Sequence, residues 1–326
     1  MTVITELASM KTAGSVPEGS VFLLGHFDGV HLGHRALCEE ARLLSDRICS
    51  ESGRRPSVAV WTLSGLDRGS ALTLNGEKLR LFSLLGADYA LTRDFSDVRS
   101  LDGEEFFRSF LEDWRPAGVV CGYNFTFGRG AACGAEDLSR MAREVGIACS
   151  VVPAFTKDGR EVSSTEIRRL VSEGRMKEAA ELSGRPYFVS GTIRHGHRIG
   201  HEIGWPTVNL RIPAGKLLPP FGVYASVVRW QTPDGPVSPP TPGVSNLGSR
   251  PTVNGDREDV TLETHLFCDP GELYGAEAAV WLWDFLRPET RFDSLDELRS
   301  AIGKDAEAAA LSSESCLKRY EHELSL

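Results

Sequence analysis

Two histidines three residues apart, His31 and His34, lie in a turn that also carries three glycines. The turn follows an apolar run at residues 21–24, which is typical of a buried strand, and it precedes apolar positions spaced for one face of a helix. Glycine permits a sharp turn and close approach of a ligand, and a helix start offers free N–H groups to an anion. We therefore expect a triphosphate cradle in which the imidazoles stabilise charge on the leaving group.

An ordinary glycine-rich turn with two solvent-facing histidines is the alternative interpretation of this stretch. The full string G-x-F-D-G-x-H-x-G-H, placed between a strand and a helix, favours the phosphate interpretation. No Walker A string occurs, and His26 is the only other histidine in this half, with no cysteine pair at zinc-ligand spacing. The remaining members of the candidate phosphate site are Gly25, Phe27, Asp28 and Gly33.

A second candidate phosphate element is the string S-S-T-E-I-R at residues 163–168, at the start of an expected helix. Ser164 or Thr165 can cap that helix, and Arg168 adds a bidentate donor for phosphate. A plain helix cap is the commoner explanation of such a string by itself. The histidine turn in the same half favours a phosphate role.

The densest set of glycine and polar residues spans 191–209. Arg194 and Arg198 supply positive charge in an acidic chain, and these arginines favour phosphate over a transition metal held by the three interspersed histidines. Thr207 and Asn209 are two apart, so on a strand they share one face and suit an oxygen-ligated cation such as Mg²⁺. The glycines expected to let the backbone fold over a ligand are Gly191, Gly196, Gly200 and Gly204.

The elements that must position the histidine turn alternate between short apolar runs and amphipathic segments. Asp102 and Glu105 form a capping-box pattern that opens one of the expected helices. Such alternation predicts an α/β Rossmann-like domain with a parallel sheet, whose ligands bind at the carboxyl ends of the strands. The strands expected after the first span residues 57–63, 89–92, 118–122 and 148–153.

The rhythm changes after Gly184, where strand-like pieces separated by glycine and proline take over. No long helical pattern returns until Ser294. This is typical of an antiparallel β-barrel or sandwich with an appended C-terminal helix. We therefore predict two domains, residues 1–184 and residues 185–326.

Composition limits the partners of the chain. Its 326 residues carry a net charge of −9 with a pI near 5.5, so we expect no nucleic-acid partner and no membrane partner. We expect no signal peptide, because the N-terminal residues lack a basic leader and a long apolar core. Seven scattered cysteines without a C-x-x-C pair fit a reducing, cytoplasmic location.

Three strings of the first half occur in an order that resembles the bacterial family of bifunctional riboflavin kinase/FAD synthetases. They are G-x-F-D-G-x-H-x-G-H at 25–34, G-Y-N-F-T-F-G at 122–128 and S-S-T-x-I-R at 163–168. The resemblance implies a nucleotidyltransferase domain that transfers AMP from ATP to FMN and releases pyrophosphate, with His31 and His34 on the ATP phosphates. The residues implied to close on the phosphates are Ser164, Thr165 and Arg168, and those implied to face nucleotide or flavin are Asn124 and Phe127.

Residues 191–209 resemble the riboflavin kinase signature G-x-V-x-x-G-x-x-x-G-x-x-L-G-x-P-T-A-N, and further matches follow. The resemblance implies a riboflavin kinase-like barrel that makes FMN, with Thr207 and Asn209 ligating Mg²⁺ beside ATP. It implies that Glu263 takes the proton of the riboflavin 5′-hydroxyl, which phosphoryl transfer requires; an exposed strand glutamate is the alternative for this residue. The residues implied to border the isoalloxazine ring are Arg287 and Phe292.

One departure from the family keeps other functions open. The family usually follows its second strand with Phe-x-Pro-x-Pro, whereas residues 61–67 contain no proline. A riboflavin kinase with a degenerate adenylyltransferase domain is therefore an alternative, and a non-catalytic flavin-binding regulator is another. An aminoacyl-tRNA synthetase shares a His-x-Gly-His turn, but no K-M-S-K-S loop occurs. The expected ligands are riboflavin, FMN and ATP with Mg²⁺.

Overall fold

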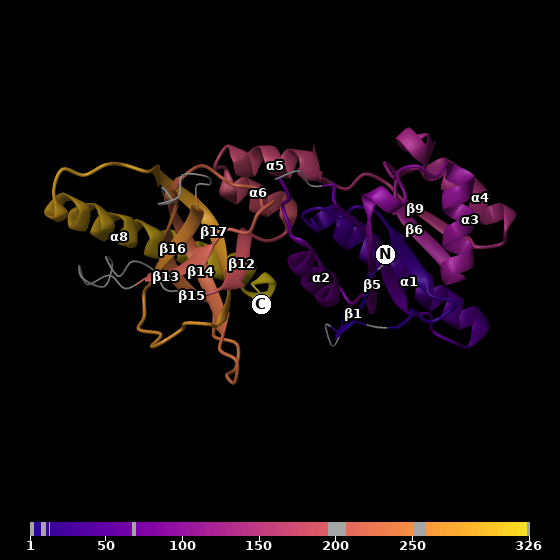
Figure 1. The fold of residues 1–326 in the computed structure, drawn as a ribbon, viewed down its shortest axis with the longest axis horizontal. Coiled ribbons are helices and arrows are strands. Elements are labelled where there is room, and N and C mark those ends of the chain that lie inside the picture. The colour runs from indigo at the N-terminus through magenta and orange to yellow at the C-terminus, as the bar shows by residue number, and fades with distance from the viewer. Residues whose placement is uncertain are drawn as a thin grey trace. The chain divides into compact units, whose positions relative to one another are not determined.

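The structure, a computed structural model, describes residues 3–7, 11–12, 14–66, 70–194, 207–250 and 259–324. Its contacts divide the chain into two compact units, residues 1–164 and residues 165–326 (Figure 1). The functional division predicted at residue 184 lies after two helices that open the second unit, and it stays a prediction.

The first unit is built on a seven-stranded sheet in the order β2-β1-β5-β4-β3-β6-β9. Strands β3, β4, β5, β6 and β9 are parallel, and β1 and β2 extend one edge in antiparallel pairing. Strand β3 is buried on both faces, which explains why it is apolar throughout. The strands are β1 (Val3–Glu6), β2 (Lys11–Thr12), β3 (Val21–Leu24), β4 (Val58–Ser64), β5 (Tyr89–Asp94), β6 (Gly118–Gly122) and β9 (Ala148–Val152).

Helices cover the sheet of the first unit (Figure 1), and apolar residues of the helices and strands form its core. Phe22 of β3 packs edge-on against Phe110 of α3, and Leu138 of α4 belongs to the same buried cluster. The predicted capping box at Asp102 is confirmed, because Glu105 N–H donates to its carboxylate over 2.9 Å. The helices are α1 (Leu32–Ser52), α2 (Asn75–Leu84), α3 (Gly103–Trp114) and α4 (Ala135–Glu144), with 3₁₀ turns η1 (Phe95–Asp97) and η2 (Arg129–Ala131). Two small hairpins pair β7 (Thr126–Phe127) with β8 (Cys133–Gly134) and β10 (Thr156–Lys157) with β11 (Arg160–Glu161).

The second unit is a six-stranded antiparallel sheet in the order β12-β17-β14-β15-β16-β13. A bridge between Arg194 and Asn209 joins its two end strands, so the sheet curls round on itself. The predicted fold class is confirmed: an α/β unit with a parallel sheet precedes a curled antiparallel sheet with a C-terminal helix. The elements are α5 (Ser164–Ser172), α6 (Met176–Ser183), β12 (Tyr187–Thr192), β13 (Thr207–Arg211), β14 (Gly222–Gln231), β15 (Thr241–Arg250), β16 (Asp259–Leu266), β17 (Glu277–Pro288), α8 (Leu295–Tyr320) and η3 (Glu321–Glu323).

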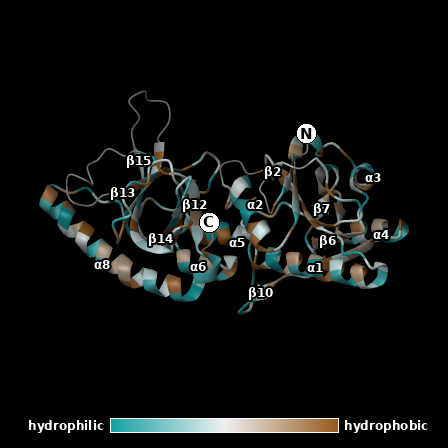
Figure 2. Ribbon diagram, turned by 90° about the horizontal axis from the view of Figure 1, so that it is seen from below, coloured by the Kyte–Doolittle hydropathy of each residue, from teal (hydrophilic) through white to brown (hydrophobic). Residues whose placement is uncertain are grey.

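Helix α8 packs along strands β14, β15 and β17. Hydrophobic and hydrophilic residues alternate along it (Figure 2), as expected for a helix with one face on a sheet. Its buried residues, Ala309, Ser313, Cys316 and Tyr320, recur every three or four positions. Among the described residues, no helix combines the length and the apolarity that a bilayer crossing requires.

Candidate active sites

The histidine turn lies at the carboxyl end of β3 and has a strained backbone. Phe27 and Val30 adopt φ values of 57° and 40°, a left-handed conformation that residues with a Cβ rarely adopt. Such strain persists only where the surrounding structure fixes it, and it is common at ligand sites. His31 ends the turn as the N-cap of α1, which begins at Leu32. The predicted strand–turn–helix context of the two histidines is therefore present.

Asp28 anchors this turn to a distant segment. Its buried carboxylate accepts backbone N–H groups from Leu72 at 3.1 Å and Thr73 at 3.0 Å. The Gly29 N–H donates to the Thr73 hydroxyl over 2.9 Å. In the structure, Asp28 therefore stabilises the conformation of the turn. Its contact with ATP phosphates stays a prediction.

A second anchor holds the turn through the carbonyl of His26. This oxygen accepts hydrogen bonds from Lys78 Nζ at 2.8 Å and from Thr62 Oγ1 at 3.0 Å. Both side chains are buried. Sequence reasoning missed Lys78, because a lysine on a helix 52 residues away gives no local signal that it reaches this turn.

The two histidine rings stack on each other at the start of α1. Their centroids are 3.7 Å apart and their planes are inclined by 19°. The His31 N–H donates to Nδ1 of His34 over 3.3 Å. Because Nδ1 of His34 accepts this bond, we assign the proton of the neutral ring to Nε2, which makes Nε2 a donor. A donor at Nε2 can give a hydrogen bond to a phosphate oxygen.

Two glycines of the histidine turn leave space for aromatic side chains of the same turn. A Cβ on Gly33 would lie 3.1 Å from the His31 ring, and one on Gly25 would lie 2.8 Å from the Phe27 ring. The Phe27 ring is buried and packs edge-on against His34 at 5.2 Å. Gly25, Gly33 and Phe27 therefore support the histidines by packing, and their predicted contacts with ATP stay predictions.

Ser164 joins the second predicted phosphate element to the turn. Its hydroxyl donates to the backbone carbonyl of Asp28 over 2.8 Å, although the two residues are 136 positions apart. The strings at 25–34 and 163–168, which the sequence analysis linked without evidence of contact, therefore touch each other within the first unit. Thr165, which is exposed, and Arg168, which is half-buried, follow on α5 in the second unit, and their closing role stays a prediction.

The two predicted flavin residues of the string at 122–128 differ in their exposure to solvent. Asn124 is exposed. Phe127 is 6% exposed and lies 5.4 Å from the Phe106 ring and 5.7 Å from the Phe125 ring. The structure gives Phe127 a place in the core, and the predicted contacts of Asn124 and Phe127 with flavin stay predictions.

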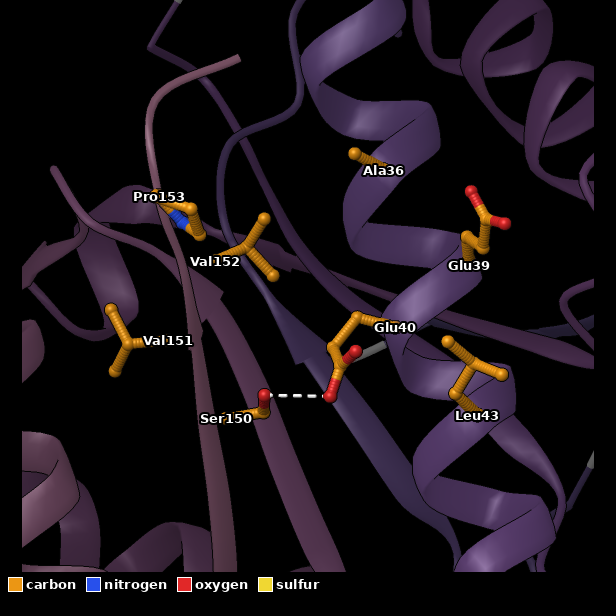
Figure 3. A pocket seen from close by; sticks show the side chains of 8 residues that line it. All are labelled: Ala36, Glu39, Glu40, Leu43, Ser150, Val151, Val152 and Pro153. Carbon is orange, nitrogen blue, oxygen red and sulfur yellow. Dashed lines mark hydrogen bonds between the residues drawn. The ribbon is translucent and has the colours of Figure 1, made fainter.

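A cavity of about 290 Å³ lies between α1 and β9 (Figure 3). The Ser150 hydroxyl donates to the Glu40 carboxylate over 2.8 Å, and Arg47 donates to the same oxygen over 2.8 Å. Partial burial favours a higher pKa for Glu40, and these two hydrogen bonds outweigh it and lower that pKa. The lining residues are Ala36, Glu39, Glu40, Leu43, Ser150, Val151, Val152 and Pro153, which include none of the predicted site residues that the structure describes.

The second site is a row of side chains across three strands. Asn209 on β13 lies directly opposite Glu263 on β16, and Glu263 lies opposite Asn246 on β15. Directly opposed residues on antiparallel strands point to one face, with Cβ atoms roughly 5 Å apart. The register therefore places the predicted base beside the predicted cation ligand. Sequence reasoning assigned no role to Asn246, which only the strand pairing brings to Glu263.

Thr207 and Asn209, the two predicted cation ligands, share one face of β13. The Asn209 amide nitrogen donates to the Thr207 carbonyl at 3.2 Å and to its hydroxyl at 3.4 Å, which turns the amide oxygen away from Thr207. A hydroxyl and an amide oxygen fit a hard cation that keeps water and phosphate ligands. In the part of the chain that the structure describes, no three His, Cys, Asp or Glu side chains gather as a metal site.

The same row continues to the predicted flavin residues. Val223 on β14 pairs with Asn246 on one side and with Arg287 on the other. Three strand spacings separate Glu263 from Arg287, which is about 14 Å when measured along the curled sheet. The Arg287 guanidinium lies 5.5 Å from the centre of the Phe292 ring. The two residues predicted to border the isoalloxazine ring are therefore in contact with each other.

The predicted glycines of the second site divide between described and undescribed residues. Gly191 lies on β12, where an added Cβ would meet no atom within 4 Å. The other three predicted glycines, Gly196, Gly200 and Gly204, lie outside the described residues.

Comparisons with known proteins identify both halves. A family model described as FAD synthetase matches residues 14–166, and one described as riboflavin kinase matches residues 183–312. The bifunctional riboflavin kinase/FMN adenylyltransferase of Escherichia coli (strain K12) is 35% identical over 301 residues, which cover 88% of this chain and 91% of that protein. The protein of the same description from Bacillus subtilis (strain 168) is 31% identical over 303 residues, covering 89% and 91%.

A solved structure with similarity over most of the length is among the matches. The crystal structure of a macrolide-efflux protein from Streptococcus pneumoniae has a TM-score of 0.76 at 28% identity, covering 91% of this chain and 95% of that one. The identity to the curated relatives and their coverage settle the family. The chain belongs to the bifunctional riboflavin kinase/FMN adenylyltransferases.

Proposed function

We propose that the second unit phosphorylates riboflavin to FMN and that the first unit transfers AMP from ATP to FMN, which yields FAD and pyrophosphate. Matches to both family models support two activities in one chain. The alternative of a kinase with a degenerate first domain is not favoured, because the FAD synthetase match spans 14–166 and the histidine turn keeps its strand–turn–helix setting.

In the kinase reaction, the 5′-hydroxyl oxygen of riboflavin attacks the γ-phosphorus of ATP, and the bond from that phosphorus to ADP breaks. Glu263 accepts the hydroxyl proton. Thr207 and Asn209 would hold Mg²⁺, which neutralises phosphate charge when it is bound with ATP. The register of Asn209 opposite Glu263 supports this proposal, because the proposed base and the proposed cation ligand are directly opposed on neighbouring strands.

In the adenylyl transfer, a phosphate oxygen of FMN attacks the α-phosphorus of ATP, and the bond to the departing pyrophosphate breaks. Both imidazoles lie at the start of α1, where N–H groups and the dipole favour anions. We assign to Nε2 of His34, and to His31, the donation of hydrogen bonds to the charge that develops on the pyrophosphate. The Ser164 contact with Asp28 supports a shared site for the two strings.

Product analysis tests both activities in one experiment. Purified protein is incubated with riboflavin, ATP and Mg²⁺, and the flavins are separated by chromatography over time. We expect FMN to appear first and FAD to follow. Accumulation of FMN that never becomes FAD would support the kinase alone, and flavin that binds without conversion would support a non-catalytic regulator.

We place this activity in the cytoplasm. The seven cysteines are unpaired in the structure, as thiols are in a reducing compartment. Burial raises the pKa of Cys38, Cys121 and Cys316 to about 12, which keeps these thiols protonated and inert at neutral pH. The ligands of the proposed function are riboflavin, FMN, ATP and Mg²⁺.

A further inference from the structure

Asp305 is a charged residue on the face of α8 that packs against the sheet. It precedes buried Ala309 by four positions and buried Ser313 by eight, which places all three on one side of the helix. Its side chain is 12% exposed. A carboxylate that is largely removed from water needs a strong partner, and here that partner is Arg287 of β17.

Arg287 is held on two sides. Its Nε donates to both carboxylate oxygens of Asp305 at 3.0 and 3.1 Å, and its Nη2 donates to one of them at 2.7 Å. Its Nη1 donates to the Pro288 carbonyl over 3.1 Å. These contacts fix the plane of a side chain that otherwise has many rotamers. The guanidinium so fixed is the group that lies over Phe292.

We propose that Asp305 is a positioning residue of the kinase site: it holds the Arg287 guanidinium over Phe292, so that the two form a ready-made edge for the flat ring of the flavin. A planar cation beside an aromatic ring stacks well on a conjugated heterocycle. Fixing that cation before the substrate arrives removes part of the entropy loss of binding. This inference rests on the proposed kinase function.

The location of the pair predicts which kinetic constant depends on Asp305. Arg287 lies at the far end of the cross-strand row, three strands from Glu263. An interaction at that distance contributes equally to the bound substrate and to the transition state. Its loss therefore raises KM for riboflavin and leaves kcat unchanged.

The test compares Asp305→Asn with Asp296→Asn, a matched change on the same helix. Asp296 is 93% exposed and pairs with Arg299 at 3.6 Å. We expect Asp305→Asn to raise KM for riboflavin about tenfold, as loss of a charge-assisted hydrogen bond does. We expect kcat and KM for ATP to stay within about twofold, and Asp296→Asn to match the wild type.

A double-mutant cycle separates positioning from a merely structural role. If Asp305 acts through Arg287, then Asp305→Asn causes no further rise in KM for riboflavin in an Arg287→Ala background. An unchanged KM for riboflavin in folded Asp305→Asn would overturn the inference. So would equal losses in kcat and in both KM values, which a loosened α8 would produce.

Two further outcomes are distinguishable. If Asp305→Asn does not fold, Asp305→Glu takes its place, since it keeps the charge and shifts the carboxylate by one methylene. The same result is expected: KM for riboflavin rises while KM for ATP does not. If the wild-type protein makes no FMN from riboflavin and ATP, the proposed function fails, whereas wild-type turnover with unaltered Asp305→Asn kinetics overturns only the positioning role.

Discussion

The proposed phosphate sites of the two units lie on different kinds of backbone. The histidine turn of the first unit has left-handed φ values at Phe27 and Val30 and depends on anchors from residues 72–78. The site of the second unit is a row of opposed residues on regular strands, from Asn209 through Glu263 to Asn246. A strained turn offers N–H groups and closely packed rings, whereas a strand row offers side-chain oxygens at a fixed spacing.

This contrast predicts different sensitivities. Activity at the first site should fall when a methyl group is added to a glycine of the turn, because Gly25 and Gly33 leave space for the rings of Phe27 and His31. The second should respond mainly to the removal of single side-chain oxygens, because the strand ladder keeps its shape when one side chain is shortened. Variants of the two kinds, each measured for FMN formation and for FAD formation, test this difference in sensitivity.

The largest effect is expected for His34→Ala. This change removes the Nε2 donor and the acceptor of the His31 N–H. We expect FAD formation from FMN to fall about 100- to 1,000-fold, as loss of a donor to developing charge does. FMN formation should be unchanged, and His322→Ala, a change within η3 of the second unit, should alter neither rate. A loss of FMN formation in folded His34→Ala would contradict the separation of the sites.

The next effect concerns the proposed cation. Asn209→Ala removes one oxygen ligand while leaving β13 paired with β16. We expect the Mg²⁺ concentration that gives half-maximal FMN formation to rise about 10- to 100-fold. A chelator in excess should abolish FMN formation in wild type and variant alike. An unchanged Mg²⁺ requirement in Asn209→Ala would remove this residue from the proposed ligand set.

A smaller effect is expected from one added methyl group in the turn. In Gly33→Ala the new Cβ would lie 3.1 Å from the His31 ring, which must shift. We expect FAD formation to fall about tenfold, because small displacements of a catalytic group cost rate. Gly76→Ala, where no atom lies within 4 Å of the added Cβ, is the control. Equal rates for the two variants would show that the histidine rings tolerate displacement.

Local patterns allowed much of the architecture to be predicted. The apolar run at 21–24, the helix after the histidine turn and the Asp102 capping box are all present, because each depends on residues close in sequence. The change from helices and parallel strands to antiparallel strands also follows from periodicity. The edge strands β1 and β2 were not predicted, since neither Val3–Glu6 nor Lys11–Thr12 is a continuous apolar run like residues 21–24.

The site could be predicted only in part, because its supports come from far along the chain. Asp28 reaches Thr73, and Arg287 reaches Asp305, through tertiary packing that no spacing reveals. For Phe127 the motif suggests a flavin contact, whereas its burial among aromatic rings is a tertiary feature that the motif does not reveal, and the flavin contact stays a prediction. Residue type and order indicate the chemistry, while register and long-range hydrogen bonds decide which residues meet.

If two independent sites act in sequence, single variants should separate the two activities, and a pair of variants tests this most directly. His31→Ala and Glu263→Ala are each supplied with ATP and Mg²⁺ and with either riboflavin or FMN, and the flavin products are separated. We predict that His31→Ala converts riboflavin to FMN and stops there, whereas Glu263→Ala converts FMN to FAD and leaves riboflavin unchanged. Loss of both activities in either variant, with the fold intact, would contradict the account.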